Sequence, residues 1–282
     1  EIHHFDGSKK IKILNSLNVG RPYEVTVSPK EEKALILNHR HELLLLDLKT
    51  EKIKKIDQSK FGPIWGCDWS PDGKYVAYDC SLNIRSSVIK IYELKTGKSH
   101  IVSSPVLHDS QPVFDPTGKY LTFLSARVFN PVPDSLQFDY GFPSGIKPYV
   151  LTLSSDTLSP LIKEVERKKN DDKDKKKKED KKEQGLNIKI DFEGIQDRVI
   201  SIPVPERRYQ GIGFSENKIF YSFSPIKGSI SPGWYNIQRS PQNILKYFDI
   251  EDLKENDFCM GMSDFSQSKD KTKIMVNFGN KV

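Results

Sequence analysis

The sequence predicts an all-β fold, a β-propeller of four-stranded blades, from a repeated turn signature and its spacing. Residues 69–78 read Trp-Ser-Pro-Asp-Gly-Lys-Tyr-Val-Ala-Tyr, and residues 114–123 repeat the pattern as Phe-Asp-Pro-Thr-Gly-Lys-Tyr-Leu-Thr-Phe. Each copy indicates strand, tight turn and strand, because proline presets φ, glycine tolerates a positive φ, and an apolar run follows. A weaker copy spans Val27–Leu37. The prolines at positions 29, 71 and 116 are 42 and 45 residues apart, and a period of about 40–45 residues is typical of propeller blades.

The N-terminal residues indicate part of one blade and then a complete blade. Two short strands, Ile2–Phe5 and Lys10–Leu14, predict the outer half of a blade. Because the chain starts without Met, in what reads as mid-strand, we expect it to be a fragment of a longer protein. A full blade follows, with strands expected at Tyr23–Val27, Lys33–Leu37, His41–Leu48 and Lys52–Ile56.

The second full blade repeats the first at a constant offset. Ile89–Lys98 reads Ile-Lys-Ile-Tyr-Glu-Leu-Lys-Thr-Gly-Lys and repeats the earlier Leu44–Lys52, Leu-Leu-Leu-Asp-Leu-Lys-Thr-Glu-Lys. Two sequence features therefore recur in the same order, which supports a blade repeat. The strands of this blade are expected at Ile64–Trp69, Tyr75–Asp79, Ser87–Glu93 and Ser99–Val102.

The third blade is interrupted twice. Its first two strands, Pro112–Phe114 and Tyr120–Ser125, precede the long aromatic and proline-rich loop Arg127–Gly145. A loop of this length in a compact domain is usually functional, and its aromatic residues predict that it packs on the propeller. The blade resumes at Pro148–Ser154, and the sequence returns to strand from Ile188.

The second interruption is a charged tract, which we predict to be a mobile insertion within the blade over residues 163–186. Lys163–Glu183 holds eleven basic and eight acidic residues. Such a segment has too few apolar side chains to offset the entropy lost on ordering.

A fourth blade and two further strands complete the chain. The fourth blade has strands at Tyr209–Phe214, Lys218–Ser224 and Ile244–Ile250, with the loop Ser229–Gln242 between the last two. Phe258–Phe278 gives two more strands. Residues 1–282 thus form a single propeller domain of about five blade-equivalents, either closed by its two ends or part of a larger ring.

Charge and composition exclude several function classes. The net charge is +6, but the tract supplies three of those charges and its interleaved acids would repel phosphate, so no nucleic-acid partner is predicted. No signal peptide and no apolar run of the roughly 18 residues that a transmembrane helix requires is present, so no membrane association is predicted. Three cysteines without a Cys-x-x-Cys motif favour the cytoplasm, free thiols and no zinc site, although Cys67 and Cys80 lie in neighbouring strands and a disulfide between them stays an alternative.

A search for catalytic motifs finds none that specifies chemistry. The Gly-x-Ser-x-Gly, P-loop and His-Glu-x-x-His patterns are missing from the sequence. His39 and His41 read as surface histidines. The run His108-Asp109-Ser110 has the residue types of a hydrolytic triad, but adjacency in sequence is not triad geometry. No catalytic residue, cofactor or metal is predicted.

Two long segments resemble a known family. Residues 123–143, Phe-Leu-Ser-Ala-Arg-Val-Phe-Asn-Pro-Val-Pro-Asp-Ser-Leu-Gln-Phe-Asp-Tyr-Gly-Phe-Pro, and Lys189–Tyr209 are similar to the larger propeller of tricorn-type proteases, and they occur in that family's order. The resemblance covers the chain from about Gly20 onward. The charged tract departs from the family pattern in length and charge.

The resemblance implies a part of a seven-bladed propeller in a large, cytoplasmic, hexameric serine peptidase. Its catalytic serine and histidine would lie in C-terminal domains, so no catalytic residue carries over. The propeller would gate or guide peptides, and its partners would be peptides or the remaining domains and subunits. The first strands of the blades would line the axial channel. Candidate contacts with substrate or partner in the two long loops are Arg127, Phe129, Asp134, Phe138, Tyr140 and Trp234.

Two other functions remain open from the sequence. One is a free-standing propeller scaffold that binds proteins through the two long loops. The other is a propeller enzyme that acts on a small molecule or uses a metal, for which the sequence offers no ligand cluster.

Overall fold

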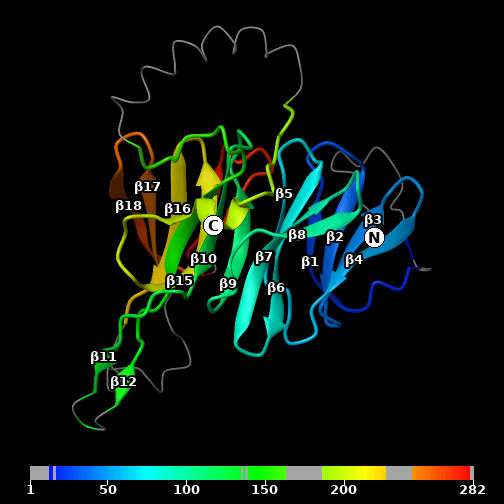
Figure 1. The fold of residues 1–282 in the computed structure, drawn as a ribbon. Helices are drawn as coiled ribbons and strands as arrows, with labels where there is room; N and C mark the ends of the chain where they lie inside the picture. The colour runs from blue at the N-terminus through cyan, green and yellow to red at the C-terminus, as the bar shows by residue number, and fades with distance from the viewer. Residues whose placement is uncertain are drawn as a thin grey trace, which may run out of the picture.

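The computed structural model describes residues 13–14, 17–134, 136, 139–162, 186–226 and 243–279. Within these residues the chain forms four four-stranded antiparallel sheets and two two-stranded ones, and the only helix is a 3₁₀ turn, η1 (Ile195–Arg198). The predicted all-β propeller architecture is confirmed. The sheets stand side by side as successive blades (Figure 1).

The blades follow the order of the chain. Blade 1 contains β1 (Pro22–Val27), β2 (Lys33–Asn38), β3 (Glu42–Asp47) and β4 (Lys52–Gln58). Blade 2 contains β5 (Cys67–Trp69), β6 (Tyr75–Asn83), β7 (Ser86–Glu93) and β8 (Lys98–Ile101). Blade 3 contains β9 (Asp109–Phe114), β10 (Tyr120–Ser125), β13 (Lys147–Thr152) and β14 (Val199–Ser201). Blade 4 contains β15 (Arg208–Ser215), β16 (Lys218–Ser224), β17 (Asn243–Asp249) and β18 (Lys254–Met262), and the terminal pair is β19 (Asp264–Gln267) and β20 (Ile274–Asn277).

The repeated turns are built as the sequence predicts. Gly73 and Gly118 adopt φ values of 73° and 70°. The residue before each turn proline closes the turn with its side chain: Ser70 Oγ accepts a hydrogen bond from Tyr75 N (2.9 Å), and Asp115 Oδ1 accepts one from Tyr120 N (2.7 Å). The polar residue at this position therefore fixes the hairpin between the first and second strands of the blade.

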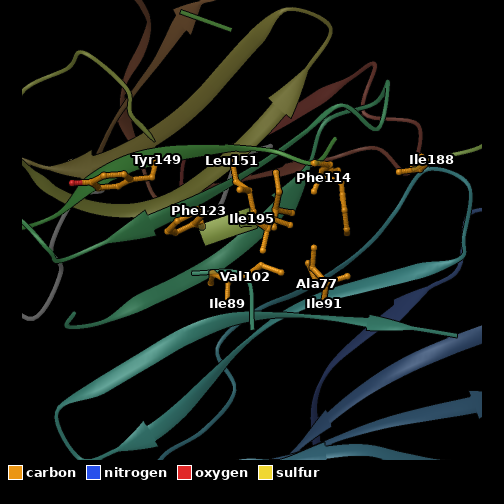
Figure 2. Close-up of a cluster of buried hydrophobic side chains, with 12 residues drawn as sticks. Ala77, Ile89, Ile91, Val102, Phe114, Phe123, Tyr149, Leu151, Ile188 and Ile195 are labelled. Carbon is orange, nitrogen blue, oxygen red and sulfur yellow. The ribbon is translucent and has the colours of Figure 1, made fainter. Parts of the chain in front are cut away.

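Apolar side chains fill the spaces between neighbouring blades. Figure 2 shows the cluster between blades 2 and 3, which Ile188 and Ile195 complete from the segment before β14. Its core members are Ala77, Ile89, Ile91, Val102, Phe114, Leu121, Phe123, Tyr149, Leu151 and Leu153. Separate clusters lie between blades 1 and 2, between blades 3 and 4, and between blade 4 and the terminal pair. Face-to-face blade packing thus forms the core.

Two predicted strands are wrong in part. The segment Ile64–Trp69 is a strand only from Cys67, because Trp65 N donates to the Asp79 carboxylate (2.8 Å) instead of to the sheet. Residues 188–192 are not a strand. Ile188 N donates to Asp72 Oδ2 (3.1 Å), and its side chain packs against Gly118, so this segment crosses the ends of two blades.

The long loop of blade 3 also differs from its prediction. Residues 127–145, here called the arm, include the small hairpin β11 (Val132–Pro133) and β12 (Tyr140–Gly141). The arm projects away from the blades instead of packing on them (Figure 1). Phe129 and Tyr140 are 82% and 66% exposed, so aromatic content alone did not determine burial here.

The predicted charged insertion, residues 163–186, lies outside the described residues except for Leu186. Its flanking strands β13 and β14 are paired neighbours in blade 3. The predicted strands Ile2–Phe5 and Lys10–Leu14 also lie outside the described residues except for Ile13 and Leu14. Cys67, Cys80 and Cys259 are free, so no disulfide joins Cys67 to Cys80.

Candidate functional site

An axial cavity of about 1050 Å³ lies between the first strands of the blades. Each of the four segments expected to line the channel contributes to its wall. The wall consists of Glu24–Val27, Trp65–Trp69, Gln111–Val113, Ile212 and Gln267–Lys271, with prolines of three turns at one end. These residues come from every blade and from the terminal pair, which places the cavity on the propeller axis.

Side chains join each first strand to the next around this cavity. Among the described residues, no ladder joins the strands of neighbouring blades, and a single bridge connects Ser87 with His108. The amides and carbonyls at the strand edges therefore need other partners. The bonds are Trp69 Nε1 to Thr26 O (3.1 Å), Phe114 N to Asp68 Oδ2 (2.7 Å), Gln111 Nε2 to Gln210 O (2.8 Å), Phe214 N to Gln267 Oε1 (3.0 Å) and Gln267 Nε2 to Phe214 O (2.9 Å). They hold the wall as one framework.

Acidic groups gather on the side of the cavity formed by blades 1 and 2. Burial raises the pKa of the Glu24 carboxyl, and the nearby Asp68 charge raises it further. Behind the wall, burial raises the pKa of Asp79 to about 7, although hydrogen bonds from the amides of Trp65 and Gln111 act to lower this pKa. Lys271 from the terminal pair forms an ion pair with Asp68, with 2.6 Å between Nζ and Oδ2. The lining of the cavity holds three carboxyl groups, from Glu24, Asp68 and Asp270, and three ammonium groups, from Lys30, Lys269 and Lys271.

Apolar side chains share the same wall and remain open to solvent. Val25, Val27 and Trp65 are 58%, 49% and 68% exposed, and all three line the cavity. Val113 and Ile212 add further apolar surface. A cavity with apolar walls and a few convergent charged groups suits an organic ligand such as a peptide.

The arm is a second candidate surface, anchored at its base by Arg127. The Arg127 guanidinium donates to Asp109 Oδ2 (2.6 Å) and Ser125 Oγ (2.8 Å), and its carbon lies 5.1 Å from the centre of the Tyr149 ring. Beyond this anchor the arm exposes apolar side chains, with Phe129 and Phe142 in contact at 5.5 Å between ring centres. The exposed apolar residues of the arm are Phe129, Val132, Leu136, Tyr140 and Phe142.

The four predicted contact residues that the structure describes, Arg127, Phe129, Asp134 and Tyr140, belong to the arm and do not line the axial cavity. Arg127 is occupied within the chain, and its side chain is only 15% exposed. Phe129 and Tyr140 are open to solvent, while Asp134 accepts a hydrogen bond from Leu136 N (2.8 Å) within the arm. Phe138 and Trp234 lie outside the described residues.

The strands of the cavity were predictable from the sequence, but its charged side chains, among them Glu24, Asp68 and Lys271, were not. Asp68 directly precedes Trp69 of the repeated turn signature. An acidic residue inside the first strand of a blade was the sequence feature that could have indicated a charged cavity wall. No sequence feature indicated Lys271, because its position in the cavity depends on contacts between sheets distant in sequence. In the adjacent trio His108-Asp109-Ser110, Asp109 is bound to Arg127 and His108 is exposed.

The described part of the chain contains no group of three or more histidine, cysteine or acidic residues placed to hold a metal ion. None of its described residues forms a helix long and apolar enough to cross a membrane.

Comparison with known proteins gives a consistent match. The family model of the tricorn protease second beta propeller domain matches residues 1–282. A putative tricorn-like protease C-terminal subunit of Sulfurisphaera tokodaii is 35% identical over 278 residues, 98% of this chain and 29% of that protein. A tricorn protease homolog of Saccharolobus solfataricus is 31% identical over 272 residues, 96% of this chain and 23% of that protein.

The fold agrees as well. The crystal structure of the tricorn protease superposes with a TM-score of 0.76 at 22% identity, over 92% of this chain and 24% of that one. The chain thus spans between 23% and 29% of the length of the two curated relatives described.

Proposed function

The chain belongs to the tricorn protease second β-propeller family, and from that premise we propose that it guides or gates peptides on their way to a catalytic chamber formed by other domains. It is a propeller region of a tricorn-like protease. The relatives named as proteases are three to four times longer. We include in the proposal that the peptidase activity and its catalytic residues reside in other domains. The observation that carries it is the axial cavity of about 1050 Å³.

The wall of this cavity suits an extended peptide. A strand advances about 3.4 Å per residue, so the six residues of β1 offer a wall about 20 Å long. The first strand of each blade pairs with only one other named strand of the described sheets. Edge groups that no side chain of the next blade occupies can bind a peptide backbone. Val25 and Trp65 provide apolar contacts for side chains.

Filling the cavity tests the proposal. Val25→Trp adds a large side chain at an exposed position of the wall, so we expect it to weaken the binding of fluorescent eight-residue peptides at least tenfold. Ile84→Trp is the matched control, because Ile84 is 78% exposed and does not line the cavity. Equal peptide affinities for the two variants would contradict the proposal.

We also propose that the arm binds the remaining domains or subunits of the assembly, which in this family would be a hexamer. The exposed aromatic residues support this role, because a soluble surface seldom leaves such a patch uncovered. The candidate contacts stay Arg127, Phe129, Asp134, Phe138, Tyr140 and Trp234.

Light scattering of the full-length protein tests the arm. Phe129→Ser with Tyr140→Ser should reduce the assembled mass, while Ile84→Ser should not. An unchanged mass for the double variant would refute this role of the arm. A natural gene product of only this chain's mass would instead favour a free-standing scaffold.

A cytoplasmic location is part of the same proposal. Three free cysteines suit a reducing compartment. Recovery of the protein outside the cytoplasm after cell fractionation would contradict it.

A further inference from the structure

Lys271 places a primary ammonium group inside the axial cavity. It lies on the turn between β19 and β20, but its side chain is only 12% exposed. Its Nζ donates to Asp68 Oδ2 on β5 (2.6 Å) and to the Phe114 carbonyl on β9 (2.5 Å). Blades 2 and 3 and the terminal pair therefore meet at one ammonium group.

The oxygen atoms that hold this ammonium are positioned by the wall itself. Asp68 Oδ2 also accepts a hydrogen bond from Phe114 N (2.7 Å), so β9 orients the carboxylate whether or not Lys271 is present. The N–H and C=O of one residue in an antiparallel strand point to the same side. Both groups of Phe114 therefore face Asp68 and Lys271.

A second carboxyl group faces the same cavity without a cation. Glu24 lies on the wall formed by β1, and Thr26 Oγ1 donates to its Oε1 at 3.4 Å. Within the residues that the structure describes, no lysine, arginine or histidine lies within ion-pair distance of Glu24. Asp68 is close enough to raise the pKa of the Glu24 carboxyl. Of these two carboxyl groups, only that of Asp68 is in ion-pair contact with an ammonium group, that of Lys271.

We propose that this wall binds the ammonium group of a peptide, from its amino terminus or a lysine side chain, and that Lys271 occupies the site when no peptide is bound. The inference rests on the proposed peptide-guiding function and names the group that the cavity recognises. An amine suits the site because it donates N–H groups to a carboxylate and a carbonyl at once.

A peptide ammonium can take the place of the Lys271 ammonium because both donate the same kind of hydrogen bonds. Lys271 sits next to exposed turn residues Asp270 and Thr272, so its flexible side chain can move into solvent while a peptide amine takes its place. While Lys271 occupies the site, a peptide cannot bind there. The apparent affinity for a peptide is therefore the intrinsic affinity multiplied by the fraction of molecules in which the site is free. Its removal should therefore increase the affinity for amine-bearing peptides.

Peptide binding with and without a free amine tests this assignment. The probes are eight-residue peptides without lysine, labelled at the carboxyl end, with a free or acetylated amino terminus, and fluorescence anisotropy of the 282-residue chain is the readout. We expect the free amine to bind about tenfold more tightly. Lys271→Met should raise this preference further, and Asp68→Asn should remove it. Lys95→Ala, at an exposed lysine that does not line the cavity, should change neither affinity.

The outcomes separate the two proposals. If peptides bind but acetylation changes nothing in the unaltered chain or in Lys271→Met, the ammonium site is refuted and the peptide-guiding function stands. If neither peptide binds to any variant, the peptide-guiding function itself fails. An acetylated peptide that contains one lysine then distinguishes the source: tight binding assigns the site to any primary ammonium, and weak binding assigns it to the amino terminus.

Discussion

Substitution of Gly118 by alanine should destabilise the protein by about 2–5 kcal/mol. Gly118 has a φ of 70°, and a left-handed conformation costs a residue with a Cβ about 1–2 kcal/mol. The new Cβ would also overlap Cγ1 and Cδ1 of Ile188, and overpacking of this kind typically costs about 1–3 kcal/mol. Urea unfolding measures the loss as a lower midpoint.

A double-mutant cycle isolates the contact with Ile188. Ile188→Ala alone should cost about 2–4 kcal/mol by opening a cavity, but in the Gly118→Ala background it should cost about 1–3 kcal/mol less because it removes the clash. Gly145→Ala is the control, since a Cβ there meets no atom within 4 Å. Equal stability of Gly118→Ala and Gly145→Ala, or strict additivity in the cycle, would refute the packing of Ile188 on this turn.

Three further predictions concern buried polar groups. Burial raises the pKa of Asp79 from 3.8 to about 7, so the folded protein holds a proton that the unfolded chain releases. The free energy of unfolding should therefore fall by up to about 1.4 kcal/mol per pH unit as pH rises from about 4 to 7. Asp79→Asn should reduce this pH dependence when it is measured by urea unfolding. An unchanged pH dependence in the variant would assign the titration to another group. Arg127→Met should lower the free energy of unfolding by about 3–5 kcal/mol because it leaves Asp109 buried without its cation. Addition of Asp109→Leu should restore part of this stability. Equal losses of stability in the single and double variants, measured by calorimetry, would contradict this pairing. Gln267→Leu removes two hydrogen bonds to Phe214, each contributing about 1 kcal/mol. The Phe214 amide hydrogen should therefore exchange with solvent about thirtyfold faster. An unchanged exchange rate would be evidence against the link between Gln267 and Phe214.

The blade repeat was predictable because its signals are local. A serine or aspartate before proline and a glycine two residues after it specify the turn by their own geometry, as Ser70, Gly73, Asp115 and Gly118 show. Continuous apolar strands then follow in sequence order. Each of these features depends only on neighbours within a few residues.

Long-range contacts explain what the sequence left out. Ile188 is not in a strand because Asp72, far back in the chain, binds its amide, and Trp65 leaves the sheet because Asp79 binds its amide. The arm has the composition of a buried loop, but nothing among the described blades covers Phe129. Lys271 reaches the cavity only because the terminal pair packs on blade 4.

Photocrosslinking tests the account most directly. A peptide that carries a benzophenone side chain is irradiated with the protein, and the attachment sites are identified by mass spectrometry. The account predicts adducts on Glu24–Val27, Trp65–Trp69 and Lys269–Lys271 of the axial wall. Adducts confined to the arm or to the outer strands β4, β8 and β18 would contradict it.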